Sequence, residues 1–143
     1  MTSMKVMLLL VLAAVAIPAT AQAQNFQVVV NATNPVAEMS KDDVSKVFLK
    51  KARKFPGGGE AVAVDQEGDV RESFSKAVHG RSASAIESHW QQQIFAGKDV
   101  PPEKKSSDSD VLEYVRSNPG AIGYVAAGTA LGSGVKAVSV GGL

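Results

Sequence analysis

The chain has 143 residues, of which 15 are basic and 14 are acidic, and it contains no cysteine. This near-neutral balance argues against a nucleic-acid binder, because proteins that neutralise phosphates carry a clear basic excess. The lack of cysteine excludes disulfides, thiolate metal sites and cysteine nucleophiles.

Residues 1–23 have the features of a secretory signal peptide. Lys5 precedes an apolar run from Val6 to Ile17 that is too short to span a bilayer comfortably, and Ala21-Gln22-Ala23 supplies a cleavage site. A cut after Ala21 is the second choice. Cleavage leaves residues 24–143 as a single domain with equal numbers of basic and acidic residues. We expect a periplasmic or secreted protein with no membrane insertion after signal cleavage.

The first part of the mature chain predicts a strand followed by a helix. Residues 26–31 form a continuous β-branched apolar run, typical of a strand covered on both faces. Ser40 and Asp43 have the spacing of a capping box at a helix start. A basic run at residues 50–54 suits the end of that helix, and the Pro-Gly-rich stretch 55–59 prevents its continuation.

The next segment predicts a strand, a tight loop and a helix start. Residues 61–64 form the strand, and Asp69 with Glu72 predicts a capping box for the following helix. Ligands, anions above all, bind at such strand-to-helix loops in α/β sheets. The alternative is an ordinary capped helix, in which the Asp69 carboxylate competes with an anion, and the residues alone favour this alternative.

A third helix is predicted to begin at Ser84 and Glu87, with an apolar stripe made of Ile86, Trp90 and Ile94. His89 lies beside this stripe and is interpreted as a packed or edge histidine. The two histidines of the chain lack the spacing of a metal-binding helix, so we predict no metal. Residues 96–102 contain Gly and two prolines and predict a surface loop.

The last part of the chain predicts a helix at residues 111–116, ended by Asn118-Pro119-Gly120, and strands at 122–125 and 135–140. Asp108 and Asp110 are interpreted as helix-start charges rather than a catalytic pair. Because no Ser/His/Asp order, metal set or nucleophile motif is present, we expect no enzyme activity and no cofactor.

Several motifs occur in an order found in one family. They are Val28-Val29-Val30-Asn31, Asn34-Pro35-Val36, Val47-Phe48-Leu49, Phe55-Pro56-Gly57, Arg71-Glu72-x-Phe74, Trp90, Phe95-x-Gly97-Lys98 with Pro101-Pro102, and Pro119-Gly120-Ala121-Ile122-Gly123-Tyr124-Val125. This order resembles the short phosphate-transporter-type periplasmic solute-binding proteins over nearly the whole mature chain. In full-length members two α/β lobes close over an oxyanion, and this chain resembles the second lobe.

The resemblance implies a three-layer α/β lobe of the type 2 periplasmic binding proteins, with a mixed, mostly parallel sheet flanked by helices. It also implies a non-enzymatic component or accessory of an ABC uptake system, with a small oxyanion such as phosphate as ligand and a membrane transporter or envelope protein as partner. The alternative is a degenerate lobe that acts as a protein–protein interaction module in the cell envelope.

The expected site departs from the family pattern. The family's second lobe usually has an arginine at the strand exit and Ser-Gly-Thr before the helix, whereas this chain has Asp65 and no Ser-Gly-Thr. The residues that remain as anion contacts are Gly68, Asp69, Val70, Arg71 and Ser73. Because four carboxylates crowd the same segment, high-affinity phosphate binding is disfavoured on electrostatic grounds.

Overall fold

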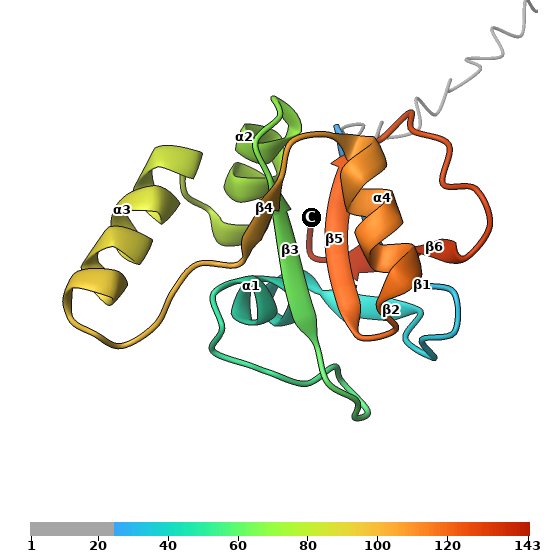
Figure 1. Ribbon diagram of the computed structural model, residues 1–143, viewed down its shortest axis with the longest axis horizontal. Coiled ribbons are helices and arrows are strands. Elements are labelled where there is room, and N and C mark those ends of the chain that lie inside the picture. The colour runs from blue at the N-terminus through green and yellow to red at the C-terminus, as the bar shows by residue number, and fades with distance from the viewer. Residues whose placement is uncertain (1–24) are drawn as a thin grey trace, which may run out of the picture.

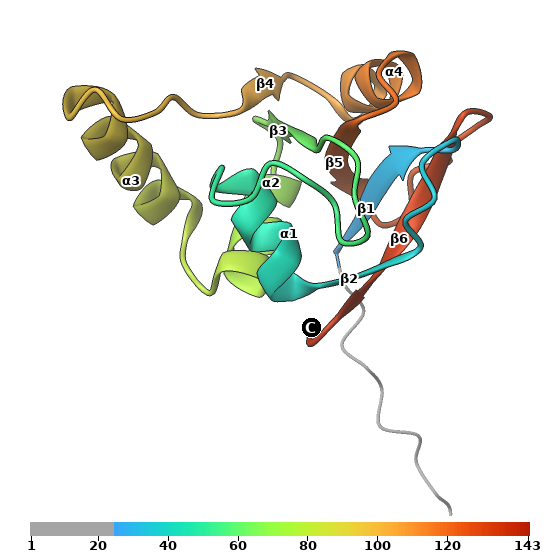
Figure 2. The ribbon, with the colours of Figure 1, turned by 90° about the horizontal axis from the view of Figure 1, so that it is seen from below.

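The computed structural model describes residues 25–143, so the predicted signal peptide lies outside the described residues. The described chain forms a mixed six-stranded sheet with helices on both faces (Figures 1 and 2). This arrangement confirms the predicted three-layer α/β fold. None of the helices in residues 25–143 is long and apolar enough to cross a membrane.

The sheet has the strand order β2-β6-β1-β5-β3-β4. Its central strand β1 pairs antiparallel with β5 and β6, and the three outer pairs are parallel. The strands are β1 (Phe26–Asn31), β2 (Glu38–Ser40), β3 (Val62–Gln66), β4 (Glu103–Lys105), β5 (Ala121–Ala126) and β6 (Val135–Gly141).

The two edge strands, β2 and β4, were not predicted. Each has only three residues. In β2 a single buried apolar residue, Met39, lies between two exposed polar ones, and β4 consists of charged residues only, so both are too short or too polar to give a strand signal. They form strands because their backbones pair with β6 and β3, respectively. The loop predicted at residues 96–102 is present, and β4 begins directly after it, at a residue for which no element was predicted.

The helices are α1 (Lys41–Phe48), α2 (Val70–Phe74), α3 (Ala83–Phe95) and α4 (Asp108–Ser117), and α2 continues into the π-helical turn η1 (Ser75–His79). Figure 2 shows α4 on one face of the sheet and α1 with α2 on the other. Helix α3 stands away from the sheet on the β4 side, as Figure 1 also shows.

Strand β1 supplies side chains to both faces, as its continuous apolar sequence predicts. Val29 packs in the cluster that contains Val111 of α4. Val28 and Val30 lie in the other cluster, with Val44 of α1. All five side chains are nearly or fully buried.

The core beneath α1 and α2 is built around aromatic rings. Phe74 stacks on Tyr124 with ring centroids 3.8 Å apart, and Phe48 lies 4.8 Å from Phe74. Phe26 meets Phe74 edge-on. This packing fixes α2 against β5 and so determines where the α2 side chains point.

The predicted capping box at the start of α2 is absent. Asp69 has helical backbone angles and its side chain makes no capping hydrogen bond. The Glu72 carboxylate instead accepts a hydrogen bond, 3.0 Å long, from the backbone N–H of Ala83 at the start of α3. Glu72 therefore ties α2 to α3, a long-range contact that the local spacing could not reveal.

Helix α3 begins earlier than predicted. Its cap is Ser82, whose hydroxyl accepts a hydrogen bond from the Ala85 N–H, so the predicted start at Ser84 was wrong. Of the predicted apolar stripe, Ile86 is buried but Ile94 is 52% exposed, because the end of α3 projects beyond the rest of the molecule.

Candidate functional site

The polar cluster at the carboxyl end of β3 depends on where that strand ends. We predicted a strand that ended at Val64, with Asp65 in the exit loop, but β3 continues to Gln66. Asp65 is 9% exposed and Gln66 is 2% exposed. The Gln66 amide donates to the Tyr124 carbonyl (2.6 Å) and to the Asp108 carboxylate (3.0 Å), which offsets the cost of burying it.

Asp65 is held inside the molecule by two donors. The Tyr124 hydroxyl donates to Asp65 Oδ1, and the backbone N–H of Gln66 donates to the same oxygen at 2.9 Å. Burial raises the pKa of Tyr124, and the negative charge of Asp65 raises it further. Tyr124 therefore keeps its proton at neutral pH and serves as a hydrogen-bond donor rather than as a base.

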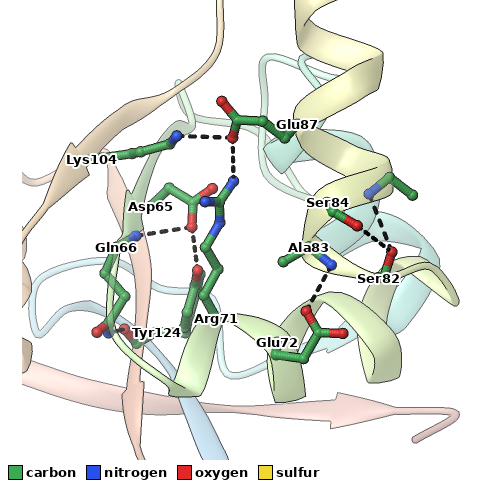
Figure 3. Close-up of polar contacts among 11 residues, drawn as sticks. Asp65, Gln66, Arg71, Glu72, Ser82, Ala83, Ser84, Glu87, Lys104 and Tyr124 are labelled. Atoms are coloured by element: carbon green, nitrogen blue, oxygen red, sulfur yellow. Dashed lines mark hydrogen bonds and ion pairs between the residues drawn. The ribbon is translucent and has the colours of Figure 1, made fainter.

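Arg71 and Lys104 meet at the carboxylate of Glu87 (Figure 3). The Arg71 guanidinium lies 2.9 Å from Glu87 Oε2, and Lys104 Nζ lies 3.0 Å from the same oxygen. The three residues come from α2, β4 and α3, so the ion pairs join side chains of three separate elements. The side chains of Arg71 and Lys104 are 19% and 27% exposed, and that of Glu87 is 44% exposed.

The electrostatics of the cluster are balanced. Burial tends to lower the pKa of Arg71, but the hydrogen bond to Glu87 and the charge of Asp65 outweigh it and raise that pKa. Hydrogen bonds from Arg71 and Lys104 lower the pKa of Glu87. The two cations, Arg71 and Lys104, are balanced by the two carboxylates, Asp65 and Glu87. With Glu87 in place, the cluster therefore has no net positive charge to attract an anion.

Among the five predicted contact residues, only Arg71 belongs to this cluster. Gly68 contributes its carbonyl, which accepts the Arg71 N–H at 3.0 Å. Asp69 is exposed, and Val70 is partly buried against the aromatic core. Ser73 lies on α2, and none of the side-chain hydrogen bonds between residues 25 and 143 involves it.

Sequence reasoning missed Glu87 and Lys104 as members of the cluster. Glu87 was interpreted as a helix-start residue, and Lys104 lay between the predicted loop and the last helix, where no element was predicted. Residues 103–105 are three consecutive charged residues, a pattern that indicates ion pairs with other segments. The partner of Lys104, Glu87, lies 17 residues away, so the sequence pattern alone could not identify it.

A separate pocket lies at the opposite end of the sheet, before the start of β3 and β5. Its volume is about 610 Å³, and it lies between the glycine loop 57–59 and the turn 118–120. Glu60 is the one charged residue among those that line it. It therefore offers no cation to an anionic ligand, and the Arg71 cluster remains the candidate for anion binding.

Metal ions are another class of ligand, and proteins bind them through histidine and carboxylate side chains. Within residues 25–143, no group of three or more such side chains is placed where it could hold a metal ion.

Comparison with solved structures identifies the fold. A substrate-binding protein assigned to phosphate ABC transport from Clostridium perfringens, solved with bound phosphate, matches 83% of this chain with a TM-score of 0.64 and 21% identity. An ABC-type phosphate transport receptor from Vibrio cholerae matches 83% of the chain with a TM-score of 0.63 and 18% identity. The PstS protein from Borrelia burgdorferi matches 82% of it with a TM-score of 0.54 and 13% identity.

This chain has the fold of one lobe of phosphate-binding periplasmic proteins. It spans slightly less than half the length of these three structures, namely 46%, 47% and 47%. No family model and no curated protein matches the sequence.

Proposed function

We propose that this protein is an exported, non-enzymatic solute-binding lobe that takes a small oxyanion such as phosphate at the Arg71 and Lys104 side chains. The observation that carries this proposal is the convergence of these two cations on one carboxylate oxygen, Glu87 Oε2, at 2.9 and 3.0 Å. A guanidinium beside an ammonium is a typical oxyanion-binding pair.

The position of the pair supports the same function. It lies at the carboxyl end of β3, next to the start of α2, where ligands bind in open α/β sheets. The named neighbours are substrate-binding or receptor proteins of phosphate transport. By analogy with them, the lobe works in the periplasm with a membrane transporter of the ABC type, as its binding component or accessory.

Titration calorimetry of residues 24–143 with phosphate and with sulfate tests this function. Arg71→Ala removes one of the two cations and leaves Asp65 without its neighbouring positive charge. Because a hydrogen bond to a charged group contributes about 1.5–3 kcal/mol, we expect affinity to fall by roughly ten- to a hundredfold.

Arg53→Ala is the matched control, since Arg53 is 71% exposed and pairs with Asp99 instead. Thermal unfolding of each variant verifies that the fold is kept. If the unaltered protein gives no heat and no thermal shift with millimolar phosphate or sulfate, the oxyanion function is wrong.

A second function, that of a protein-interaction module, is favoured by an apolar surface at the end of α3. Phe95 is 96% exposed, with Ile94 at 52% and Val100 at 57%. Large side chains grouped in this way at the surface are typical of association sites. In this function the lobe binds itself or an envelope protein through the end of α3. A strictly monomeric chain that captures no partner would argue against it.

A further inference from the structure

We propose that Glu87 is a built-in competitor of the anion, an internal carboxylate that occupies the position of a ligand oxygen and must swing out before the ligand binds. This inference rests on the proposed function, because it concerns the same two cations. It assigns to Glu87 a role in setting affinity that no feature of the local sequence suggests.

The contacts of Glu87 are those expected of a bound oxyanion. A single oxygen, Oε2, lies 2.9 Å from the Arg71 guanidinium and 3.0 Å from the Lys104 ammonium. Figure 3 shows this carboxylate reaching from α3 to the two cations. An anion that used both cations would need the same space and the same donors, so anion and Glu87 exclude each other.

Release of Glu87 requires little change elsewhere. Its side chain is 44% exposed, so the freed carboxylate regains water without leaving an apolar site. The backbone of α3 stays fixed, because Ser82 caps the helix and both Ile86 and Trp90 are buried. Rotation of the Glu87 side chain to another rotamer is therefore sufficient.

Asp65 cannot move out of the site in the same way. It is 9% exposed and accepts hydrogen bonds from the Tyr124 hydroxyl and the Gln66 N–H. With Glu87 in place, the charges of Asp65, Glu87, Arg71 and Lys104 cancel. With Glu87 swung out, the remaining three carry one net positive charge, which is the state that attracts an anion.

The test is calorimetric titration of inorganic phosphate into residues 24–143 and into the variant Glu87→Gln. Removing the competing charge should raise phosphate affinity by about tenfold, equivalent to 1.4 kcal/mol. Glu38→Gln is the charge-matched control. Glu38 is an exposed residue on β2, at the opposite edge of the sheet, and its loss should leave the affinity unchanged.

Glu87→Ala removes the carboxylate and the rest of the side chain, and it should also strengthen phosphate binding. This second variant is needed because the glutamine amide oxygen in Glu87→Gln can still accept hydrogen bonds from Arg71 and Lys104. In the Arg71→Ala background, Glu87→Gln should raise phosphate affinity less than it does in the unaltered protein, because only Lys104 is left to be released. Thermal unfolding of each variant verifies that it folds.

The outcomes separate this inference from the proposed function. If Arg71→Ala weakens phosphate binding while both Glu87 variants bind like the unaltered protein, the competitor role is overturned and the binding function stands. Tighter binding by both Glu87 variants, but not by Glu38→Gln, supports it. If neither the unaltered protein nor either Glu87 variant binds phosphate, both proposals fail.

Discussion

At the scale of single residues, the partly buried histidine His79 links η1 to α1. Its Nδ1 shares a hydrogen bond of 2.7 Å with the Ser45 hydroxyl. Burial, together with the positive charges of Arg81, His89 and Lys51, lowers the pKa of His79 to about 4. The imidazole is therefore neutral in the folded protein at pH 7.

Acidification should destabilise the protein through His79. The folded-state pKa of about 4 lies below the ordinary value of 6.5, so between these pH values the unfolded chain binds more protons. Stability is complete above pH 6.5 and falls as the pH decreases towards 4. At 1.36 kcal/mol per pKa unit, we expect a loss of roughly 2–3 kcal/mol by pH 4.5.

Urea unfolding of the unaltered protein and of His79→Gln between pH 7 and 4.5 measures this effect. The variant does not titrate here, so its stability should depend less on pH in this range. Carboxylates contribute equally to the pH dependence of the unfolding free energy in both proteins, so the difference between the two proteins isolates the contribution of His79. Equal pH dependence of the two proteins would show that His79 is not the cause.

At the scale of elements, the contact between β5 and α4 depends on Gly123. A Cβ atom at this position would lie 2.7 Å from Val111 Cγ1 and 2.8 Å from Val64 Cγ1. Both distances are too short for carbon atoms. The glycine is therefore what allows the close approach of β5 to its neighbours.

Gly123→Ala should therefore lower the free energy of unfolding by about 1–3 kcal/mol, because the added methyl group overpacks the α4 side of the sheet. Gly128→Ala is the control, since a Cβ there meets no atom within 4 Å. Urea unfolding measures both variants. A Gly123 variant as stable as the Gly128 variant would contradict this account of the interface.

At the scale of the whole molecule, the projecting end of α3 is the surface most suited to association. Phe95, Ile94 and Val100 expose more than half of their area there. We expect residues 24–143 to self-associate as concentration rises, and we expect Phe95→Ser to shift this association to higher concentration, because it removes apolar area from the contact. Size-exclusion chromatography with light scattering measures the mass.

Leu143→Ser is the matched control, because Leu143 is an exposed apolar residue (43%) at the C-terminus, outside α3. It should leave the association unchanged. A constant monomer mass over the whole concentration range would argue against self-association through α3 and leave an envelope protein as the partner to be sought by crosslinking.

Much of the fold could be predicted from the sequence. Strand β1 was predicted with its observed bounds, β5 and β6 to within one residue, and the Ser40 cap of α1 is present, with Asp43 N–H donating to its hydroxyl at 3.1 Å. These features depend on periodicity and capping, which act between residues close in the chain. The likeness to a periplasmic binding-protein lobe followed from the order of such local motifs.

The candidate site could be predicted only in part. Arg71 was named, but its partners were not, because Glu87 and Lys104 reach it across 16 and 33 positions of sequence. The sequence by itself determined the core strands, the Ser40 cap at the start of α1, and the balance of charge. Only the tertiary structure decided that Asp65 is buried and that Glu87 pairs with the two cations, since the fold brings together side chains of α2, α3 and β4 that lie far apart in the sequence.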